Sequence, residues 1–438
     1  MGATVNGQQQ HTQGGDTPTE LLEGISHEGL KRVLQAVQHR DPDQPEFLSA
    51  VKEVAQSLQP VFERQPELLR AFEVMCEPER QASGGGPYKG GLRFREGVNL
   101  SVIKFLGFEQ MFKNALTTLP MGAGKASRGG SDFDPKDKSD AEIQRFCQSF
   151  MTELYRHIGG RTDIPAGDIG CGAKEIGYLY GQFKRITGLF TGALTGKGLD
   201  FGGSEIRPEA TGYGVVFFAE CALAGAKDSI RGKRCLVSGS GNVAQFCALK
   251  LVESGALVLA MSDSHGTVYE PEGFSREQVH QVMSIKASHS GRLTDYKSDT
   301  CTYMEGAKPW AIDTPVDMAF PCATQHEVCL QDAQQLVQHG CKYLFQGANM
   351  PCTDRAVHHL EDNGVLFGPG KAANAGGVAV SGLEMVQNSV NAKLKEIMQA
   401  IYKTSKEAAD AYNVSLASGS NIASFKKVAE AVLAQGAV

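Results

Sequence analysis

The stretch that decides the fold is Arg234-Cys235-Leu236-Val237-Ser238-Gly239-Ser240-Gly241-Asn242-Val243-Ala244. A short β-rich run at 234–238 leads into the pattern G-x-G-x-x-A, and residues 243–253 then have a helical pattern that stops at Gly255. A second apolar run follows at 256–261. Strand, helix and strand in this order predict a βαβ unit and therefore a parallel sheet. The glycines allow a tight turn that brings a pyrophosphate to the helix N-terminus, so the stretch predicts a dinucleotide site.

Residues downstream of this unit bear on the choice of dinucleotide. The second strand ends in Ser262-Asp263-Ser264, and an acid at that place usually accepts the ribose 2′-hydroxyl of NAD. Here serines flank Asp263, and Lys286 and Arg292 follow. Hydroxyls and cations suit a 2′-phosphate, which favours NADP, although the two cations could instead be solvated surface groups. Further apolar runs at 318–320 and 342–345 are expected to extend the sheet.

The composition is that of a globular protein with more than one core. A chain of 438 residues predicts two domains, with 41% hydrophobic and 21% charged residues. The net charge of −6 argues against a nucleic-acid or anionic membrane surface. Eleven scattered cysteines without a Cys-x-x-Cys pair, and no visible targeting segment in the polar first sixteen residues, favour a reducing, cytoplasmic location.

A second constellation lies between Gly86 and Gly172, where three lysines and one aspartate sit on glycine-bordered turns: Lys89, Lys113, Lys125 and Asp168. Several cations with one carboxylate suit a small dicarboxylate substrate that needs a proton moved. The Gly122-Ala123-Gly124-Lys125 turn is not a phosphate loop, because Leu119 and Ala126 stand where that motif needs glycine and Ser or Thr. Beside other cations Lys125 would have a lowered pKa; the simpler alternative is a solvated loop lysine. For Asp168 the simpler alternative is an Asx turn or helix cap.

Helical patterns frame these motifs. Apolar residues after Pro45 form one helical face through Leu58, and Ser139 with Glu142 predicts a capping box. The stretch 392–412 is amphipathic, and we expect it to pack back on the first domain. The predicted organisation is an α/β protein with a substrate and oligomerisation domain at 1–200, completed by 392–438, and a Rossmann-like NAD(P) domain at 201–391, with the active-site cleft between them.

One possible metal set is incomplete. Cys322, His326 and Cys329 are close in the sequence, but no fourth ligand has the spacing that a zinc site needs. We therefore expect no metal.

Taken together, these motifs resemble the hexameric, NADP-dependent glutamate dehydrogenases of the Glu/Leu/Phe/Val dehydrogenase family. The resemblance is carried by stretches along most of the chain: 86–94, 105–121, 131–170, 195–214, the Gly239 fingerprint, 320–325, 347–351 and 368–385. It implies reversible oxidative deamination of glutamate to 2-oxoglutarate and ammonia, with hydride transfer to NADP, in a homohexamer.

The resemblance also implies roles for individual residues. Lys125 would polarise the 2-oxo group and activate water, and Asp168 would pass a proton to or from the amino nitrogen. Substrate contacts would come from Lys89 and Ser381 at the distal carboxylate, Val378 at the aliphatic stem, Lys113 and Gln110 at the α-carboxylate, and Gly90, Gly91, Ala166 and Arg207 nearby. Cofactor contacts would come from Thr211, Gly239, Ser240, Gly241, Asn242, Val243, Asp263, Ser264, Lys286, Arg292, Ala323, Thr324, Asn349 and Asn374.

The chain departs from the family pattern at four places. A strand–turn–strand stretch is missing between Arg80 and Gly84, Ala126-Ser127-Arg128 are inserted after Lys125, and the chain is shortened after Asn388. His289 stands where NADP-dependent members often have arginine. The first three changes motivate an alternative, a catalytically impaired or non-catalytic subunit. A dehydrogenase of apolar amino acids is a further alternative, against which Lys89 with Ser381 argues, because an uncompensated cation in an apolar pocket is costly.

Overall fold

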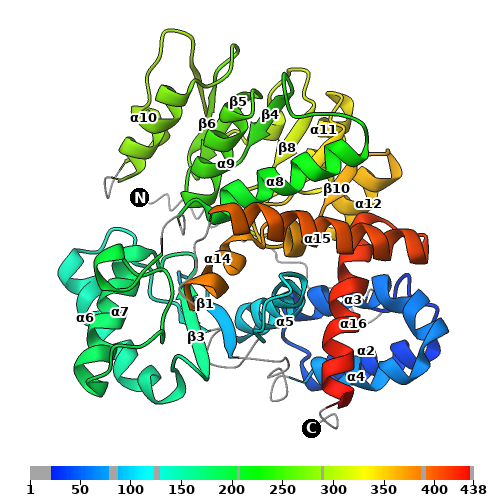
Figure 1. The fold of residues 1–438 in the computed structure, drawn as a ribbon. Helices are drawn as coiled ribbons and strands as arrows, with labels where there is room; N and C mark the ends of the chain where they lie inside the picture. The colour runs from blue at the N-terminus through cyan, green and yellow to red at the C-terminus, as the bar shows by residue number, and fades with distance from the viewer. Residues whose placement is uncertain are drawn as a thin grey trace, which may run out of the picture.

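The computed structural model describes residues 21–77, 87–122, 129–204, 208–287, 291–385 and 391–434. They form two α/β domains, which lie one above the other in Figure 1. The fold class predicted from the sequence is therefore confirmed. The domain limits at 200 and 391 stay predictions.

The first domain has a small parallel sheet in the order β2-β1-β3. Its strands are β1 (Tyr88–Phe94), β2 (Gly129–Ser131) and β3 (Asp163–Gly167). Its helices are α2 (Glu28–Arg40), α3 (Pro45–Arg64), α4 (Leu69–Met75), α5 (Leu100–Leu116), α6 (Asp140–Leu154) and α7 (Ala173–Thr187), with the 3₁₀ turns η1 (Pro66–Leu68), η3 (Tyr155–His157) and η4 (Leu199–Phe201). Figure 1 shows α6 and α7 on one side of β1 and β3, and α2 to α5 on the other.

Local sequence accounts for several of these helices. Proline opens α3 in its first turn, and the predicted face from Phe47 to Leu58 is buried. The capping box is confirmed, since the Ser139 hydroxyl accepts from Glu142 N while the Glu142 carboxylate accepts from Ser139 N. Helix α5 is buried around most of its circumference because α3 covers it on one side and the sheet and cleft lie on the other.

The second domain is built on a seven-stranded sheet in the order β10-β9-β8-β4-β5-β6-β7. The strands are β4 (Arg234–Val237), β5 (Leu257–Asp263), β6 (Gly266–Tyr269), β7 (Thr302–Glu305), β8 (Met318–Phe320), β9 (Tyr343–Phe345) and β10 (Leu366–Gly368). The five strands from β10 to β5 are parallel to one another. Strand β6 runs antiparallel to β5, and β7 runs antiparallel to β6. The βαβ unit read from the sequence is thus β4, helix α9 (Asn242–Glu253) and β5.

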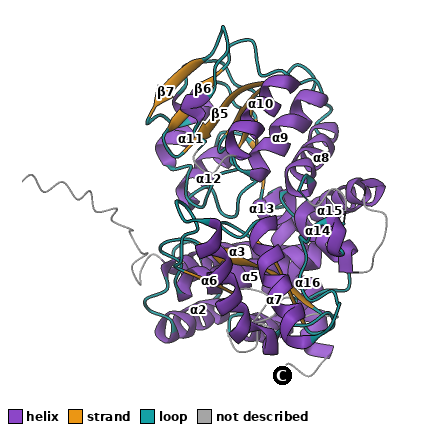
Figure 2. Ribbon diagram, turned by 90° about the vertical axis from the view of Figure 1, so that its left-hand side faces the viewer, coloured by secondary structure: helices purple, strands orange, loops and turns teal. Residues whose placement is uncertain are grey.

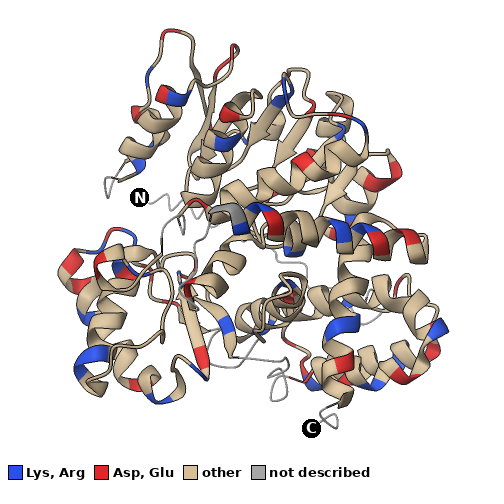
Figure 3. Cartoon of the chain, in the orientation of Figure 1, with Lys and Arg blue, Asp and Glu red and all other residues tan. Residues whose placement is uncertain are grey.

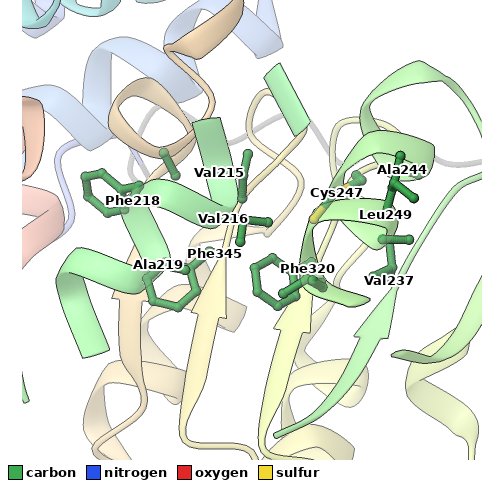
Figure 4. Close-up of a cluster of buried hydrophobic side chains, with 14 of the residues drawn as sticks. Val215, Val216, Phe218, Ala219, Val237, Ala244, Cys247, Leu249, Phe320 and Phe345 are labelled. Carbon is green, nitrogen blue, oxygen red and sulfur yellow. The ribbon is translucent and has the colours of Figure 1, made fainter. Parts of the chain in front are cut away.

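Helices cover both faces of this sheet (Figure 2). They are α8 (Ala210–Gly225), α9, α10 (Arg276–Ala287), α11 (Leu330–Gln338) and α12 (Asp354–Asp362), with η5 (Leu293–Asp295) and η6 (Pro309–Ala311). The short helices α13 (Gly370–Ala373) and α14 (Gly376–Met385) pack against α8 and the first domain. Because side chains alternate along a strand, Met318 and Phe320 face the α8–α9 layer and Ala319 faces the α11–α12 layer. Figure 4 shows the first of these cores, where Phe320 and Phe345 meet Phe218 and Val216 of α8 and Cys247 of α9.

The chain ends in two long helices, α15 (Asn391–Tyr412) and α16 (Leu416–Ala434), which pack on different domains. The expectation that the stripe of α15 faces the first domain is wrong for its first half. Leu394, Ile397, Met398 and Ile401 belong to the core of α8 and the large sheet. It is α16 that returns to the first domain, where it packs against α3, α4 and α5 (Figure 1). The stripe predicts that a helix is packed, but it carries no information about which surface covers it.

The surface carries charges of both signs. Figure 3 shows lysine and arginine interspersed with aspartate and glutamate over both domains. Within the described ranges, none of the helices combines the length and the apolar character that crossing a bilayer requires.

Candidate active site

A cleft of about 1100 Å³ separates the two domains and collects most of the residues singled out in the sequence. From the first domain it is lined by Lys89, Gly90, Gly91, Gln110, Lys113, Ala166 and Asp168. From the second domain it is lined by Thr211, Gly241, Asn242, Val243, Ala323, Thr324, Asn349, Asn374, Val378 and Ser381. Residues up to 292 positions apart in the chain, Lys89 and Ser381 among them, thus share one cavity.

Two lysines of the first domain point cations at this cleft. Lys89 lies on β1 and is almost fully buried, and its Nζ donates to the Ile164 carbonyl at 3.1 Å. Lys113 lies in the last turn of α5, and its Nζ donates to Asn349 Oδ1 of the second domain at 2.7 Å. Asn114 joins the two elements, since its Nδ2 donates to the Lys89 carbonyl at 3.0 Å and to the Gly122 carbonyl. The side chain of Asn114 therefore sets the separation of β1 from α5.

Lys125 and Arg207 lie outside the described residues, as does His289. The described chain stops at Gly122, whose backbone pairs with Tyr88 and Lys89 of β1. The expectation of a lowered pKa for Lys125 and the role of Arg207 therefore stay predictions. The three indel positions near 80–84, at 126–128 and after 388 also fall at least partly outside the described ranges.

Asp168 stands just past the end of β3, partly exposed on the cleft. Its Oδ1 accepts from the amide of the next residue, Ile169, at 2.8 Å and lies 3.4 Å from Arg93 Nη2. Arg93 Nη1 also donates across the cleft to Gln325 Oε1 at 3.4 Å. Beside it, Arg95 Nη1 donates to Thr324 Oγ1 at 3.2 Å. Two arginines of the first domain thus bridge to the loop after β8.

Arg93 and Arg95 were not among the site residues expected from the sequence, although the alternation of residues along β1 indicates them. Lys89, Gly91 and Arg93 alternate along β1, and Arg95 follows at the same spacing. Alternate residues of a strand face the same side, so a lysine that faces the cleft predicts that Arg93 faces it too.

Helix α14 adds a polar group opposite Lys89 on the second-domain side. Ser381 is almost fully buried, and its hydroxyl has no hydrogen-bond partner among the described residues. A buried hydroxyl without a partner is costly, which indicates that a ligand group satisfies it. Val378, one turn earlier on the same helix, lines the cavity with its apolar side chain.

The G-x-G-x-x-A turn at 239–244 has the backbone geometry that dinucleotide binding requires. Gly239 has a φ of +86°, which favours glycine, and its amide donates to Ser262 Oγ of β5 at 2.9 Å. Gly241 is the N-cap of α9, so the amides of the first helical turn point at the cleft without intrahelical partners. Gly239 and Ser240 do not line the cavity themselves but hold the turn, with the Ser240 carbonyl accepting from Gln245 Nε2.

Two asparagines form an amide cluster at the centre of the cleft. Asn374 Nδ2 donates to the carbonyls of Gly347 and Ala348 and to Asn349 Oδ1, at 3.0 to 3.1 Å. Its Oδ1 is buried and has no partner in the described part of the chain. An orphaned amide oxygen is a fixed acceptor that suits the carboxamide N–H₂ of a nicotinamide.

Residues at the far end of β5 lie beside the cavity rather than on its lining. Both carboxylate oxygens of Asp263 are engaged by backbone amides, Oδ1 by His265 and Oδ2 by Leu293, each at 2.9 Å. Ser264 Oγ and Arg292 Nη1 both contact His265 Nδ1. Burial lowers the pKa of Lys286, Asp263 opposes this shift, and Arg292 and Lys136 reinforce it. Two further cations, Arg292 and Lys136, thus lie near enough to Lys286 to affect its pKa, and a group of cations suits a 2′-phosphate better than a 2′-hydroxyl.

Lys136 is the member of this group that the sequence did not indicate, since it comes from the first domain. Nothing local marks it, because its effect on Lys286 arises only when the two domains face each other. The Ala323–Thr324 loop has a further unforeseen support in Glu327, whose Oε1 accepts from Ala323 N at 2.9 Å. Burial raises the pKa of Glu327 to about 7, against the opposing effect of hydrogen bonds from Ser238, Ala323 and Thr324.

Comparison with known proteins assigns the chain to a family. Residues 202–436 match the family model of Glutamate/Leucine/Phenylalanine/Valine dehydrogenase, and residues 79–185 match that of the Glu/Leu/Phe/Val dehydrogenase dimerisation domain. An NADP-specific glutamate dehydrogenase of Chlorella sorokiniana is 56% identical over 453 residues, covering 95% of this chain and 86% of that protein. The enzyme of the same name from Escherichia coli strain K12 is 49% identical over 446 residues, covering 93% and 99%.

A solved structure agrees with the fold. The crystal structure of Plasmodium falciparum glutamate dehydrogenase is 45% identical and superposes with a TM-score of 0.89, covering 96% of this chain and 99% of that one. The chain belongs to the Glu/Leu/Phe/Val dehydrogenase family.

Proposed function

We propose that the protein is an NADP-dependent glutamate dehydrogenase, which interconverts L-glutamate with 2-oxoglutarate and ammonia. The observation that carries the proposal is the joint presence in one cleft of Lys89, Lys113 and the orphaned Ser381 hydroxyl with the dinucleotide fingerprint. Relatives that bear the name NADP-specific glutamate dehydrogenase share about half of the sequence.

The substrate would be held in the cleft at both ends, by its distal carboxylate and by its α-carboxylate. Lys89 and Ser381 would hold the distal carboxylate, and Lys113 with Gln110 the α-carboxylate, while Val378 and Ala166 would contact the aliphatic stem. Gly90, Gly91 and Arg207 would complete the pocket. A dehydrogenase of apolar amino acids would have to place a hydrocarbon side chain against the buried Lys89 ammonium, and burying a charge against hydrocarbon is strongly unfavourable.

Two residues would move protons. Asp168 would take a proton from the substrate ammonium or return it, being a carboxylate exposed on the cleft and positioned by Ile169 N and Arg93. Lys125 would polarise the 2-oxo oxygen and activate the water that releases ammonia. Closing the domains would exclude bulk water, and the Arg93–Gln325 and Arg95–Thr324 contacts are of the kind that a closed cleft would use.

NADP would supply the hydride acceptor when it is bound. The α9 N-terminus with Gly239, Ser240, Gly241, Asn242 and Val243 would hold the pyrophosphate. Asn349, Asn374, Thr211, Ala323 and Thr324 would orient the nicotinamide half. Ser264, Lys286 and Arg292 with Lys136 would bind the 2′-phosphate, and Asp263 would organise them through its two backbone contacts.

We further propose a homohexamer in the cytoplasm. The match of residues 79–185 to a dimerisation domain supports assembly, and the hexamer follows the family resemblance. The eleven cysteines are all free thiols, which suits a reducing compartment. Light scattering after size exclusion tests the hexamer, and fractionation of the source cells tests the location.

The test of the activity is to express this chain and follow NADPH absorbance with 2-oxoglutarate and ammonium, beside a Lys125→Ala control. We expect oxidation that requires ammonium, exceeds the rate with NADH, and disappears in the control. A folded, NADPH-binding protein without turnover would instead support the non-catalytic subunit. Faster turnover with 4-methyl-2-oxopentanoate than with 2-oxoglutarate would support the dehydrogenase of apolar amino acids.

A further inference from the structure

A buried ion pair, Lys197–Glu384, joins helix α14 of the second domain to the first domain. Lys197 Nζ lies 3.3 Å from Glu384 Oε1, and the second carboxylate oxygen of Glu384 accepts from the Gly196 amide at 3.1 Å. Lys197 Nζ also donates to the Leu194 carbonyl and lies 5.4 Å from the centre of the Tyr180 ring. Both charged side chains are 3 to 4% exposed, so each is held by several contacts in a place that water barely reaches.

The two partners come from segments that are far apart in the chain. Glu384 lies on α14, one helical turn after Ser381 and on the same side of the helix. Lys197 lies in the first-domain segment that follows α7, and that segment is fixed to β3 by the bond from Thr195 N to the Pro165 carbonyl at 3.0 Å. The pair therefore connects the helix that carries Ser381 to the strand that precedes Asp168.

Other packing supports the same attachment. Gly382, next to Ser381, faces the first domain so closely that an added Cβ would lie 2.7 Å from Leu119 Cδ1. Helix α14 follows β10 of the nucleotide domain in sequence, yet it is fastened to the first domain by close packing at Gly382 and by charge at Glu384. The helix also packs against α8 of the nucleotide domain, and the ion pair adds an attachment to the first domain one turn from Ser381.

We propose that the Lys197–Glu384 pair determines specificity for the distal carboxylate by holding the Ser381 hydroxyl in line with Lys89. The inference rests on the proposed function, because it is the glutamate or 2-oxoglutarate side chain that Lys89 and Ser381 would share. Neither partner reacts; both are positioning residues. Loss of the pair would let α14 rotate, and a shift of about 1 Å in Ser381 would weaken binding of the distal carboxylate while leaving the α-carboxylate and 2-oxo contacts in place.

The test compares two 2-oxo acids that differ only beyond the stem. Binding of 2-oxoglutarate and of 2-oxobutyrate to the NADPH-loaded protein is measured by calorimetry for the parent, Glu384→Gln and Glu384→Asp, with steady-state kinetics alongside. We expect Glu384→Gln to weaken 2-oxoglutarate about tenfold or more and 2-oxobutyrate less than about twofold. Glu384→Asp keeps the negative charge on a shorter side chain, so the ratio of 2-oxoglutarate to 2-oxobutyrate affinity should fall by less. This variant replaces Glu384→Gln in the test if the Gln variant does not fold.

A second interdomain ion pair, with a buried lysine and a half-buried glutamate, offers a control. Lys371 of α13 pairs with Glu53 of α3 at 2.8 Å, also between domains but outside the cleft. Glu53→Gln should lower stability without changing the ratio of the two oxo-acid affinities. The proposal is overturned if Glu384→Asp or Glu384→Gln weakens both oxo acids equally, if the ratio is unchanged, or if the parent itself does not prefer 2-oxoglutarate. A parent that binds 2-oxoglutarate selectively but does not turn it over would refute the proposed function and leave this inference standing.

Discussion

The two faces of the cleft present different chemical groups. The first-domain face presents long cationic side chains, Lys89 and Arg93 from β1 and Lys113 from α5. The second-domain face presents small residues around Ala323 and Gly347, together with the amides of the first turn of α9, which have no intrahelical partners. Charge on side chains suits a small dicarboxylate whose two ends must both be held, whereas backbone and shape suit a long dinucleotide. Substitutions on the first-domain face should therefore weaken use of the oxo acid, whereas substitutions on the second-domain face should weaken NADPH binding.

The largest effect is expected from Lys89→Met. The substitution removes a buried ammonium and would leave the distal carboxylate of 2-oxoglutarate without its charged partner. A cost of about 4 kcal/mol corresponds to a loss of about 10³ in kcat/KM, with NADPH affinity unchanged. Steady-state kinetics and NADPH fluorescence titration measure the two quantities. A loss below about tenfold would place the distal carboxylate elsewhere.

On the other face the sharpest change is Gly239→Val. Its φ of +86° is strained for valine, and a Cβ would lie 3.3 Å from Ala323. We expect NADPH affinity to fall about 100-fold, because the fingerprint turn can no longer hold its shape. The matched control is Gly232→Val, where φ is +76° but no atom lies within 4 Å of the added Cβ. That variant should lose stability and keep NADPH affinity; equal losses of affinity in both would show that strain alone is responsible.

The contacts that join the two faces should have an intermediate effect. Lysine in place of Arg93 cannot reach Asp168 and Gln325 together, because it lacks the planar fork. We expect Arg93→Lys to lower kcat about tenfold and Arg95→Lys, which disturbs only the Thr324 contact, to lower it less than about threefold. Both losses are measured as steady-state kcat at saturating substrate concentrations. Equal effects of the two variants would mean that contact with Asp168 adds nothing.

The smallest effect concerns the support of the cofactor loop. The pKa of Glu327 is raised from 4.5 to about 7 by burial, so the folded protein keeps a proton that the unfolded chain has lost. Its contribution to stability is therefore present below about pH 4.5 and is lost as the pH rises through about 7. Relative to Glu327→Gln, the parent should lose about 1 kcal/mol of unfolding free energy between pH 5 and pH 6, measured by urea denaturation. A constant difference across this range would contradict the assignment.

Local pattern was sufficient to predict the framework of the nucleotide domain. The run at 234–238, the helical pattern at 243–253 and the run at 256–261 became β4, α9 and β5 with their limits shifted by one or two residues. The reason is that G-x-G-x-x-A fixes a strand-to-helix turn by short-range sterics, which φ at Gly239 reflects. Most of the site residues were implied by the family resemblance rather than by local pattern, and most of them line the cleft.

Contacts between distant segments could not be predicted in the same way. The partner predicted for α15 is wrong for the first half of that helix, because an amphipathic stripe specifies burial and not the surface that buries it. The Arg93–Gln325 bridge joins residues 232 positions apart, and the Lys197–Glu384 pair joins residues 187 apart. Lys136 belongs with Lys286 and Arg292 only once the domains are assembled. Such partners follow from tertiary packing, for which a single sequence carries no local signal.

The most direct test of the central claim follows the transferred hydrogen. The protein is incubated with L-glutamate deuterated at Cα and with NADP, and the nicotinamide product is examined by NMR. We expect NADPH that carries deuterium at C4 in one of its two positions, together with 2-oxoglutarate and ammonium in equal amounts. Product without deuterium at C4, or no reduced nucleotide from a folded protein that binds NADP, would contradict it.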